Sequence, residues 1–346
     1  MKKLLILFMV AVLSVSGLAG CSQPAGPKAG QMKIVCTTFP QYDWVRQILG
    51  DRAKDAELTL LLDNGADLHN YQPTTGDIVK ISQCDLFIYV GGESDEWVDD
   101  VLRSANNKKM VRVNLLEALG DAAKAEELLD GMEHDHDHEE AHDEDRDHEE
   151  EHKEEEHGEE EHHDGEETKY DEHIWLSLKN ALKLCGVLTD KICALDEKNA
   201  TEYKQNYVDY TELIDMLDSD YQTAVGTAAR KSILFCDRFP FFYMTSDYSL
   251  TPYAAFSGCS AEVEASFDTV AFLAKKVDEL KLPYVLIIDG SDKSLANTVI
   301  ATTKDKNQQI LSLNSMQSIT AKDVKEGVSY LSIMKDNLSV LKKALN

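Results

Sequence analysis

The chain has 346 residues and a formal net charge of −28, and most of that charge lies in one segment, residues 133–169. This segment holds 21 acidic residues against three basic ones, a balance of −18, which leaves about −10 for the rest of the chain. Because acidic surfaces are repelled by phosphate backbones, the charge excludes nucleic acid as a partner. With an amino-terminal leader and the acidic segment set aside, the length predicts two domains of ordinary size.

The amino terminus has the pattern of a secretory leader: a basic MKK start, an apolar run over residues 4–15 and the sequence LAGC at residues 18–21. The apolar run is too short for a retained membrane-spanning helix, so we predict a signal peptide over residues 1–20. LAGC resembles the lipobox of bacterial lipoproteins, which implies a diacylglyceryl group on the sulfur of Cys21. Since two acyl chains hold a soluble domain stably on a membrane, we expect residues 21–31 to be a lipidated tether and the protein to be extracytoplasmic and membrane-anchored.

Short apolar runs alternate with helical patterns in the first folded region, for which we predict bounds of 32–195. The run over residues 84–90 is almost continuously apolar, as in a parallel strand that is covered on both faces. This alternation predicts a parallel sheet flanked by helices, with ligands at the carboxyl ends of the strands. The predicted strands are residues 32–36, 58–62, 84–90 and 111–115, and helices are predicted over 39–49, from 74 through 81 and around 97–102.

The acidic segment, residues 133–169, also holds nine of the eleven histidines of the chain. It cannot bury an apolar core, so we expect it to be a disordered loop when metal-free. Imidazole and carboxylate groups bind borderline divalent cations, which makes the segment a loose cation trap, although a merely solvated charged tract is the alternative. Only His69 and His173 remain in sequence that is able to fold.

The remainder of the chain predicts one long helix and a second lobe. Residues 197–225 contain neither Pro nor Gly, and apolar and tyrosine side chains recur there at helical spacing. We therefore predict a rigid linking helix over residues 196–226 and a carboxyl-terminal lobe over residues 227–346. The fold class is α/β, with two lobes that each contain a mainly parallel β-sheet flanked by helices. The predicted strands of the second lobe are 232–236, 251–256, 284–289 and 309–313, and its predicted helices are 239–247, 266–280, 293–303 and 322–345.

Four residues are candidate metal ligands from their places at strand ends and in loops. A cleft between the two sheets would collect His69 and His173 from one wall and Cys236 and Asp289 from the other. The simpler alternatives are a buried inert thiol for Cys236 and a helix N-cap for Asp289. The six cysteines after Cys21 form no CxxC pair and are too sparse for a disulfide framework, so we expect most of them to be buried apolar residues.

Two sequence motifs carry a family resemblance. LLDNGADLHNYQPTTGD, at residues 61–77, and DEHIWLSLKNA, at residues 171–181, are similar to the metal-histidine segments of cluster A-I solute-binding proteins, the zinc and manganese receptors of ABC importers. The similarity extends from about residue 32 to the carboxyl terminus and includes the histidine-rich acidic insertion of the zinc members. The resemblance implies that His69 and His173 bind the metal.

The same resemblance implies a third histidine or a glutamate from the second lobe and an acidic residue late in that lobe, which Asp289 fits. Where the family usually has HDAFGYF, this chain has CDRFPFF at residues 236–242. Cys236 would then replace the imidazole with a thiolate, which suits zinc and disfavours manganese. Alternatively, water or a carboxylate such as Glu262 or Glu264, near Cys259, completes the coordination shell.

We predict that the protein is an extracytoplasmic, high-affinity zinc receptor that delivers Zn²⁺ to an ABC import permease. We expect it to be a monomer and not an enzyme. A manganese receptor of the same type, with Mn²⁺ as cargo, is the first alternative. A metal-buffering or adhesin lipoprotein is the second. A secreted zinc hydrolase is disfavoured, because the sequence outside the acidic segment has no HExxH motif and the chain has no nucleophile elbow.

Overall fold

The computed structural model describes residues 31–132, 169–259 and 264–346. The predicted signal peptide, Cys21 with nearly all of its tether, the acidic segment up to residue 168, and Glu262 lie outside the described residues. No helix in the described ranges is long and apolar enough to span a membrane.

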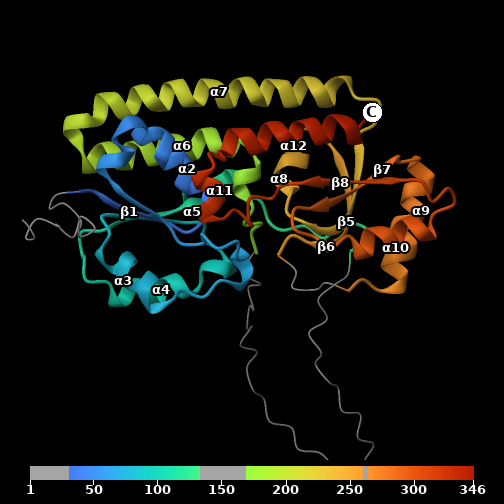
Figure 1. Cartoon of the computed structure of the whole chain (residues 1–346), viewed down its shortest axis with the longest axis horizontal. Coiled ribbons are helices and arrows are strands. Elements are labelled where there is room, and N and C mark those ends of the chain that lie inside the picture. The colour runs from blue at the N-terminus through green and yellow to red at the C-terminus, as the bar shows by residue number, and fades with distance from the viewer. Residues whose placement is uncertain (1–30, 133–168, 260–263) are drawn as a thin grey trace, which may run out of the picture.

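The first lobe is built on a four-stranded parallel sheet with the strand order β2-β1-β3-β4. Strand β1 is central and almost fully buried, because Ile34, Val35 and Cys36 are covered on both faces of the sheet. Helices α3 and α4 lie on one side of the sheet, and α2 and α6 lie on the other (Figure 1). The strands are β1 (Lys33–Cys36), β2 (Glu57–Leu60), β3 (Leu86–Tyr89) and β4 (Val111–Asn114), and the helices are α2 (Phe39–Leu49), α3 (Thr75–Gln83), α4 (Trp97–Ser104), α5 (Leu115–Leu119) and α6 (Leu178–Leu195).

The second lobe repeats this plan with the strand order β6-β5-β7-β8, again all parallel. Two parallel sheets flanked by helices confirm the predicted fold class. The strands are β5 (Ser232–Phe239), β6 (Thr251–Ser257), β7 (Tyr284–Ile288) and β8 (Gln309–Leu313), and the helices are α8 (Phe242–Asp247), α9 (Phe267–Leu280), α10 (Ser294–Thr302), α11 (Ala321–Lys325) and α12 (Tyr330–Ala344).

The structure differs from the predicted bounds at two places in the second lobe. Strand β5 continues to Phe239, so the helix predicted from that residue begins only at Phe242. The single closing helix predicted over residues 322–345 is broken at Gly327, where φ is +92°. A residue with a side chain avoids that conformation, and the second helix starts afresh with a capping box at Ser329.

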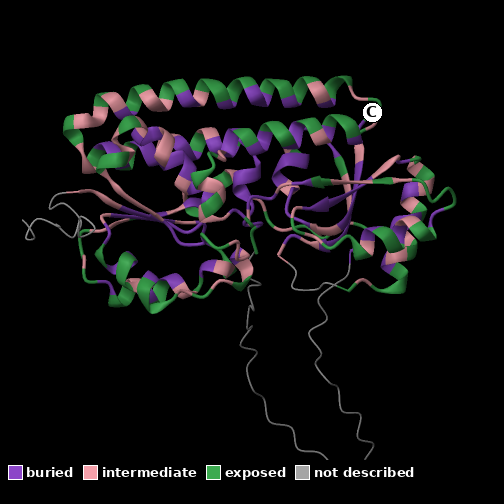
Figure 2. Cartoon of the chain, in the orientation of Figure 1, coloured by how far each residue is buried: buried purple, intermediate pink, exposed green. Residues whose placement is uncertain are grey.

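Helix α7 (Ala200–Thr227) is the long helix that the sequence predicts, preceded by a short 3₁₀ turn at Glu197–Asn199. Its 28 residues extend about 42 Å at 1.5 Å per residue, enough to run along both lobes, as Figure 1 shows. One face packs on α6, α2 and α12, while the opposite face is largely exposed (Figure 2). The helix therefore supports both sheets from the same side of the molecule.

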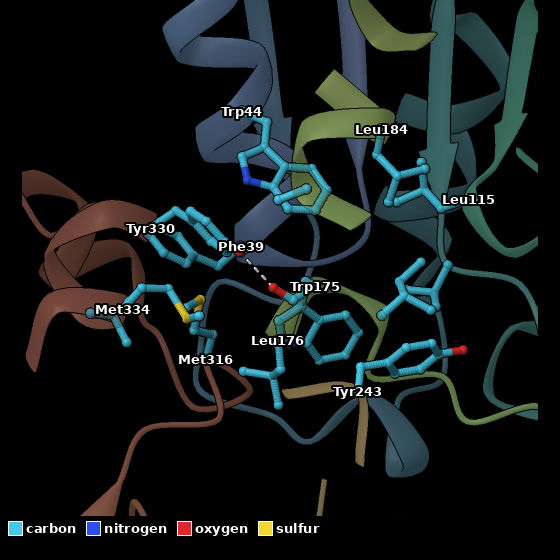
Figure 3. Packing of buried hydrophobic residues seen from close by; sticks show 14 of the residues in the cluster. Phe39, Trp44, Leu115, Trp175, Leu176, Leu184, Tyr243, Met316, Tyr330 and Met334 are labelled. Carbon is cyan, nitrogen blue, oxygen red and sulfur yellow. Dashed lines mark hydrogen bonds between the residues drawn. The ribbon is translucent and has the colours of Figure 1, made fainter. Parts of the chain in front are cut away.

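A large buried cluster connects the two lobes (Figure 3). Trp175, which follows the second candidate metal ligand by two residues, donates from its indole nitrogen to the Ser315 carbonyl at 2.9 Å. Its own carbonyl accepts from the Tyr330 hydroxyl at 2.8 Å, and the Tyr330 ring packs edge-on against Trp44 at 5.4 Å between centroids. The segment that carries His173 is thus held by residues from both halves of the chain.

We predict that Tyr221→Phe destabilises the protein by about 1 kcal/mol, because the buried Tyr221 hydroxyl donates to the Met334 carbonyl at 2.7 Å and joins α7 to α12. Urea denaturation followed by circular dichroism measures the change. Tyr207→Phe, at a half-buried position on the same helix, is the control, with an expected change below about 0.5 kcal/mol. Equal losses in the two variants would contradict the assignment.

Candidate metal site

His69 lies in a short 3₁₀ turn, Leu68–Asn70, in the connection that follows strand β2. Asp67 caps this turn by accepting from the His69 backbone amide at 3.1 Å. The other carboxylate oxygen of Asp67 accepts from the Arg238 guanidinium of the second lobe at 2.7 Å. Asp67 thereby fixes the backbone of the histidine and ties its loop to the end of strand β5.

His173 is fully buried at the start of the turn Ile174–Leu176, whose three side chains are also buried. Asp171 accepts from the His173 backbone amide at 2.8 Å, and the same carboxylate oxygen lies 3.1 Å from the Nδ1 atom of the ring. A carboxylate at Nδ1 orients an imidazole and leaves Nε2 as its outward-facing donor, which is the usual arrangement around metal-binding histidines.

The two imidazoles meet through their Nε2 atoms, which are 3.2 Å apart. The ring centroids are separated by 5.1 Å, and the rings are tilted by 57°. The Nδ1 atom of His69 lies 2.7 Å from the Ser94 hydroxyl, so both rings have their second nitrogen engaged by an oxygen. The two Nε2 atoms thus meet although their residues are 104 positions apart in the chain.

The electrostatic surroundings shift the pKa values of the two rings in opposite directions. Burial, and after it the neighbouring His173 ring, lower the pKa of His69 to about 3, so His69 is uncharged at neutral pH. Burial also acts to lower the pKa of His173, but the carboxylates of Asp171 and Glu172 outweigh it and raise that pKa above its ordinary value. A neutral imidazole is the form that binds a metal ion.

Glu172 is a buried carboxylate beside this pair. One oxygen accepts from the Ser94 backbone amide at 2.9 Å, while the other lies 3.6 Å from His69 Nδ1 and has no hydrogen-bond partner. A Cβ atom at Gly92 would lie 2.3 Å from the Glu172 carboxylate, so the close approach depends on that glycine. The buried negative charge of Asp171 and Glu172 favours a bound cation at the histidine pair.

A third donor, the Cys259 sulfur, completes a compact group with the two rings. The three candidate donor atoms, one from each side chain, lie within 4.8 Å of one another. Cys259 comes from the second lobe, two residues after strand β6 ends at Ser257. The intervening Gly258 passes directly over the imidazole: a Cβ atom there would lie 3.0 Å from His173 Cε1.

Cys259 is not among the ligands predicted from the sequence, although it is close in the chain to two candidate carboxylates, Glu262 and Glu264. A usable signal was present, because Gly258 and Cys259 follow the carboxyl end of a predicted parallel strand. The same rule selected Cys236 and Asp289.

Cys236 and Asp289 are not part of this three-residue group. Cys236 is 2% exposed and packs in the small core of the second lobe, where burial raises the pKa of its thiol. Asp289 accepts from the backbone amide of Ser315 at 2.7 Å and from its hydroxyl at 3.0 Å, and it also accepts from the Ser318 hydroxyl. It does not cap helix α10, whose N-cap is Lys293. A metal-binding role for either residue stays a prediction.

Both residues line a cavity of about 790 Å³ at the carboxyl ends of strands β5 and β7. Glu264, another candidate from the sequence, lies on the same cavity, together with Asp237 and Arg238. The structure therefore brings together the two predicted histidines and places the predicted second-lobe residues around a neighbouring hollow.

Comparisons with known proteins agree on one family. A family model described as "Zinc-uptake complex component A periplasmic" (ZnuA) matches residues 34–344. The zinc-binding lipoprotein AdcA of Streptococcus pneumoniae is 31% identical over 347 residues, which cover 99% of this chain and 61% of the relative. The high-affinity zinc uptake system protein ZnuA of Bacillus subtilis is 27% identical over 348 residues, which cover 99% of this chain and 98% of the relative. The chain thus spans about 61% of the length of the AdcA relatives.

Solved structures show the same fold. The Zn(II)-bound ZnuA-like domain of Streptococcus pneumoniae AdcA superposes with a TM-score of 0.66 at 27% identity, covering 91% of this chain and 99% of that domain. The Bacillus subtilis lipoprotein YcdH gives a TM-score of 0.68 at 23% identity, which supports the fold alone. Because the family model covers most of the sequence, and in agreement with the resemblance read from the two histidine motifs, this chain belongs to the ZnuA family of zinc-uptake complex components.

Proposed function

We propose that this protein is an extracytoplasmic receptor that binds Zn²⁺ with high affinity and delivers it to an ABC import permease. The observation that carries the proposal is the 3.2 Å contact between the Nε2 atoms of His69 and His173. Membership of the ZnuA family and the zinc-binding names of the AdcA and ZnuA relatives support it.

The spacing of the two nitrogens matches the needs of zinc. Two nitrogens that bind one tetrahedral Zn²⁺ ion at about 2.0–2.1 Å lie about 3.3–3.4 Å apart. The observed 3.2 Å separation is therefore close to that of a formed site, and little movement of the rings is needed. Manganese favours oxygen donors and binds a given nitrogen site more weakly than zinc, so this pair supports zinc over manganese.

The position of the pair supports a receptor rather than a catalyst. His173 is fully buried and both Nδ1 atoms are engaged, whereas zinc hydrolases keep an open coordination position for an activated water. We propose that Cys21 carries the lipid anchor that holds the receptor on the membrane, and that the protein acts as a monomer. The acidic histidine-rich segment then gathers cations near the site by local concentration and charge.

We expect His69→Ala combined with His173→Ala to abolish tight zinc binding, with an affinity loss greater than the roughly 10–100-fold that removal of an outer partner costs. Competition titration against a chromophoric zinc chelator measures the affinity. His134→Ala combined with His136→Ala, in the acidic segment, is the control and should keep the tight site. A double variant at 69 and 173 that keeps its tight zinc would favour a metal buffer over a receptor.

Asp171→Asn is expected to weaken zinc binding about 10–100-fold, because the carboxylate orients the His173 ring and increases the electron density at Nε2. Isothermal titration with the same chelator in competition measures the loss. Asp99→Asn, at an exposed position on α4, should leave the affinity unchanged. If Asp171→Asn binds zinc as well as the unaltered protein, Asp171 does not support a ligand.

Replacement of residues 133–168 by a short Gly-Ser linker is expected to keep one tight zinc ion and to remove the weakly bound ones. The chain that flanks the segment is already paired, since Glu126 donates its backbone amide to the Lys169 carbonyl at 2.9 Å and Ala125 pairs with Tyr170. Metal content after dialysis at several free zinc concentrations measures both classes of ion. Loss of the tight ion in the deletion variant would show that the segment itself forms the site.

A further inference from the structure

We propose that the sulfur of Cys259 binds the zinc ion together with His69 and His173, so that the site contains one thiolate contributed by the second lobe. This inference rests on the proposed function and adds a ligand that the two histidine motifs do not supply. It also predicts a selectivity, because such a receptor binds thiophilic cations, such as Zn²⁺ and Cd²⁺, and discriminates against Mn²⁺.

The first argument is geometric. The Cys259 sulfur and one nitrogen of each imidazole lie within 4.8 Å of one another, the only such three-residue group of metal-binding side chains in the described parts of the chain. A tetrahedral zinc ion takes sulfur at about 2.3 Å and nitrogen at about 2.0–2.1 Å, so its sulfur and nitrogen ligands lie about 3.6 Å apart. A shift of about 1 Å brings all three atoms onto one ion.

The backbone at Gly258 brings this cysteine close to the two rings. Gly258 lets the turn lie against His173, since a Cβ atom there would meet both the ring and the Phe239 carbonyl at 3.0 Å. The buried carboxyl of Glu126, from the first lobe, faces the Ser257 side chain and the Cys259 backbone amide. The Glu172 backbone amide faces the Cys259 sulfur. The turn is therefore enclosed by groups of the first lobe.

Cys236 differs from Cys259 in the place of its side chain. Cys236 stands where the resemblance places a histidine ligand, yet it alternates with Phe235 and shares its strand face with Leu234, and both Leu234 and Cys236 are buried in the small core of the second lobe. To reach the histidines, Cys236 would have to leave that core. Cys259 lies outside that core and is only partly buried. Its sulfur already lies within 4.8 Å of a nitrogen of each imidazole.

The chemistry balances without any redox partner. As the zinc–sulfur bond forms, the thiol gives its proton to solvent and binds as a thiolate, while the two imidazoles bind through neutral Nε2 atoms. A thiolate strengthens binding of zinc and cadmium much more than binding of manganese, which prefers oxygen ligands. The lost second-lobe imidazole is thus replaced by a softer donor of the same lobe.

The test uses the chain from residue 22 onward, with Co²⁺ as a spectroscopic probe and Zn²⁺ and Mn²⁺ in competition titrations. We expect the Co²⁺ form to show a thiolate-to-cobalt charge-transfer band and the zinc form to show one sulfur neighbour at about 2.3 Å by X-ray absorption. Cys259→Ser should lose the band, and its zinc affinity should fall by more than the roughly 10–100-fold that loss of an outer partner costs, with a smaller change for manganese. Cys193→Ser, near the carboxyl end of α6, is the matched control and should change neither quantity.

Several results would overturn the inference. A band that survives in Cys259→Ser, or one that is lost in Cys236→Ser instead, assigns the sulfur elsewhere. Tight, histidine-dependent zinc binding with no sulfur neighbour in the unaltered protein refutes the thiolate ligand but leaves the proposed function standing. Absence of tight zinc binding in the unaltered protein overturns both. The spectra of the unaltered protein decide the matter even if a cysteine variant folds poorly.

Discussion

The contact between two buried imidazole nitrogens is the interaction on which the site depends. The Nε2 atoms of His69 and His173 lie 3.2 Å apart, so a proton or a cation between them stabilises the contact, whereas two bare lone pairs would repel each other. The arrangement persists because each ring is held from behind. Ser94 fixes Nδ1 of His69, Asp171 fixes Nδ1 of His173, and burial keeps His69 uncharged. The protein therefore holds the two nitrogens in a preorganised position that a bound cation would stabilise.

The rest of the fold provides the stiffness for this arrangement. The Asp67–Arg238 ion pair ties the loop of His69 to the second lobe. Trp175 donates a hydrogen bond to Ser315 from its side chain and accepts one from Tyr330 at its backbone carbonyl. Helix α7 packs along the outer side of both lobes and adds a continuous support. Because packed cores shift in discrete steps and not continuously, the ring positions are set by the same contacts that stabilise the fold.

Much of the fold could be predicted from sequence periodicity, and its failures have physical causes. Helix α2 and strand β8 have the predicted bounds, since each is a clear pattern between polar or turn residues. The prediction of one closing helix is wrong because the continuous helical pattern of its apolar residues was given more weight than Gly327. In the structure, the positive φ of Gly327 separates α11 from the helix that follows. Strand β5 ran past Cys236 because pairing with β6 continues to Phe239 across a register shift, which no local pattern reveals.

The residues of the site, like the fold, could be predicted only in part from the sequence. His69 and His173 could be identified because long local motifs surround them and few other histidines remain in folded sequence. Cys236 was selected by its place at a predicted strand end, but strand alternation turns its side chain into the core of the second lobe. Cys259 also follows the end of a predicted strand, but its distance from the histidines depends on how closely Gly258 approaches a ring 85 residues earlier in the chain. Local sequence predicts which residues can bind; tertiary packing decides which of them meet.

The distribution of donors also bears on how a tightly held ion can leave. His173 is buried in the main core, and His69 is fixed by Asp67 and Ser94, so moving either ring disturbs many contacts. Cys259 lies two residues after the end of strand β6, at the edge of the second lobe. With Cys259 as the third ligand, the ion bridges the two lobes, and its binding free energy favours the arrangement in which they meet. Withdrawal of Cys259 removes one strong bond and leaves two imidazoles, which bind zinc far more weakly. Release of the ion therefore depends on the contacts that Glu126 and the Glu172 backbone make with Gly258 and its neighbours, and not on the main core.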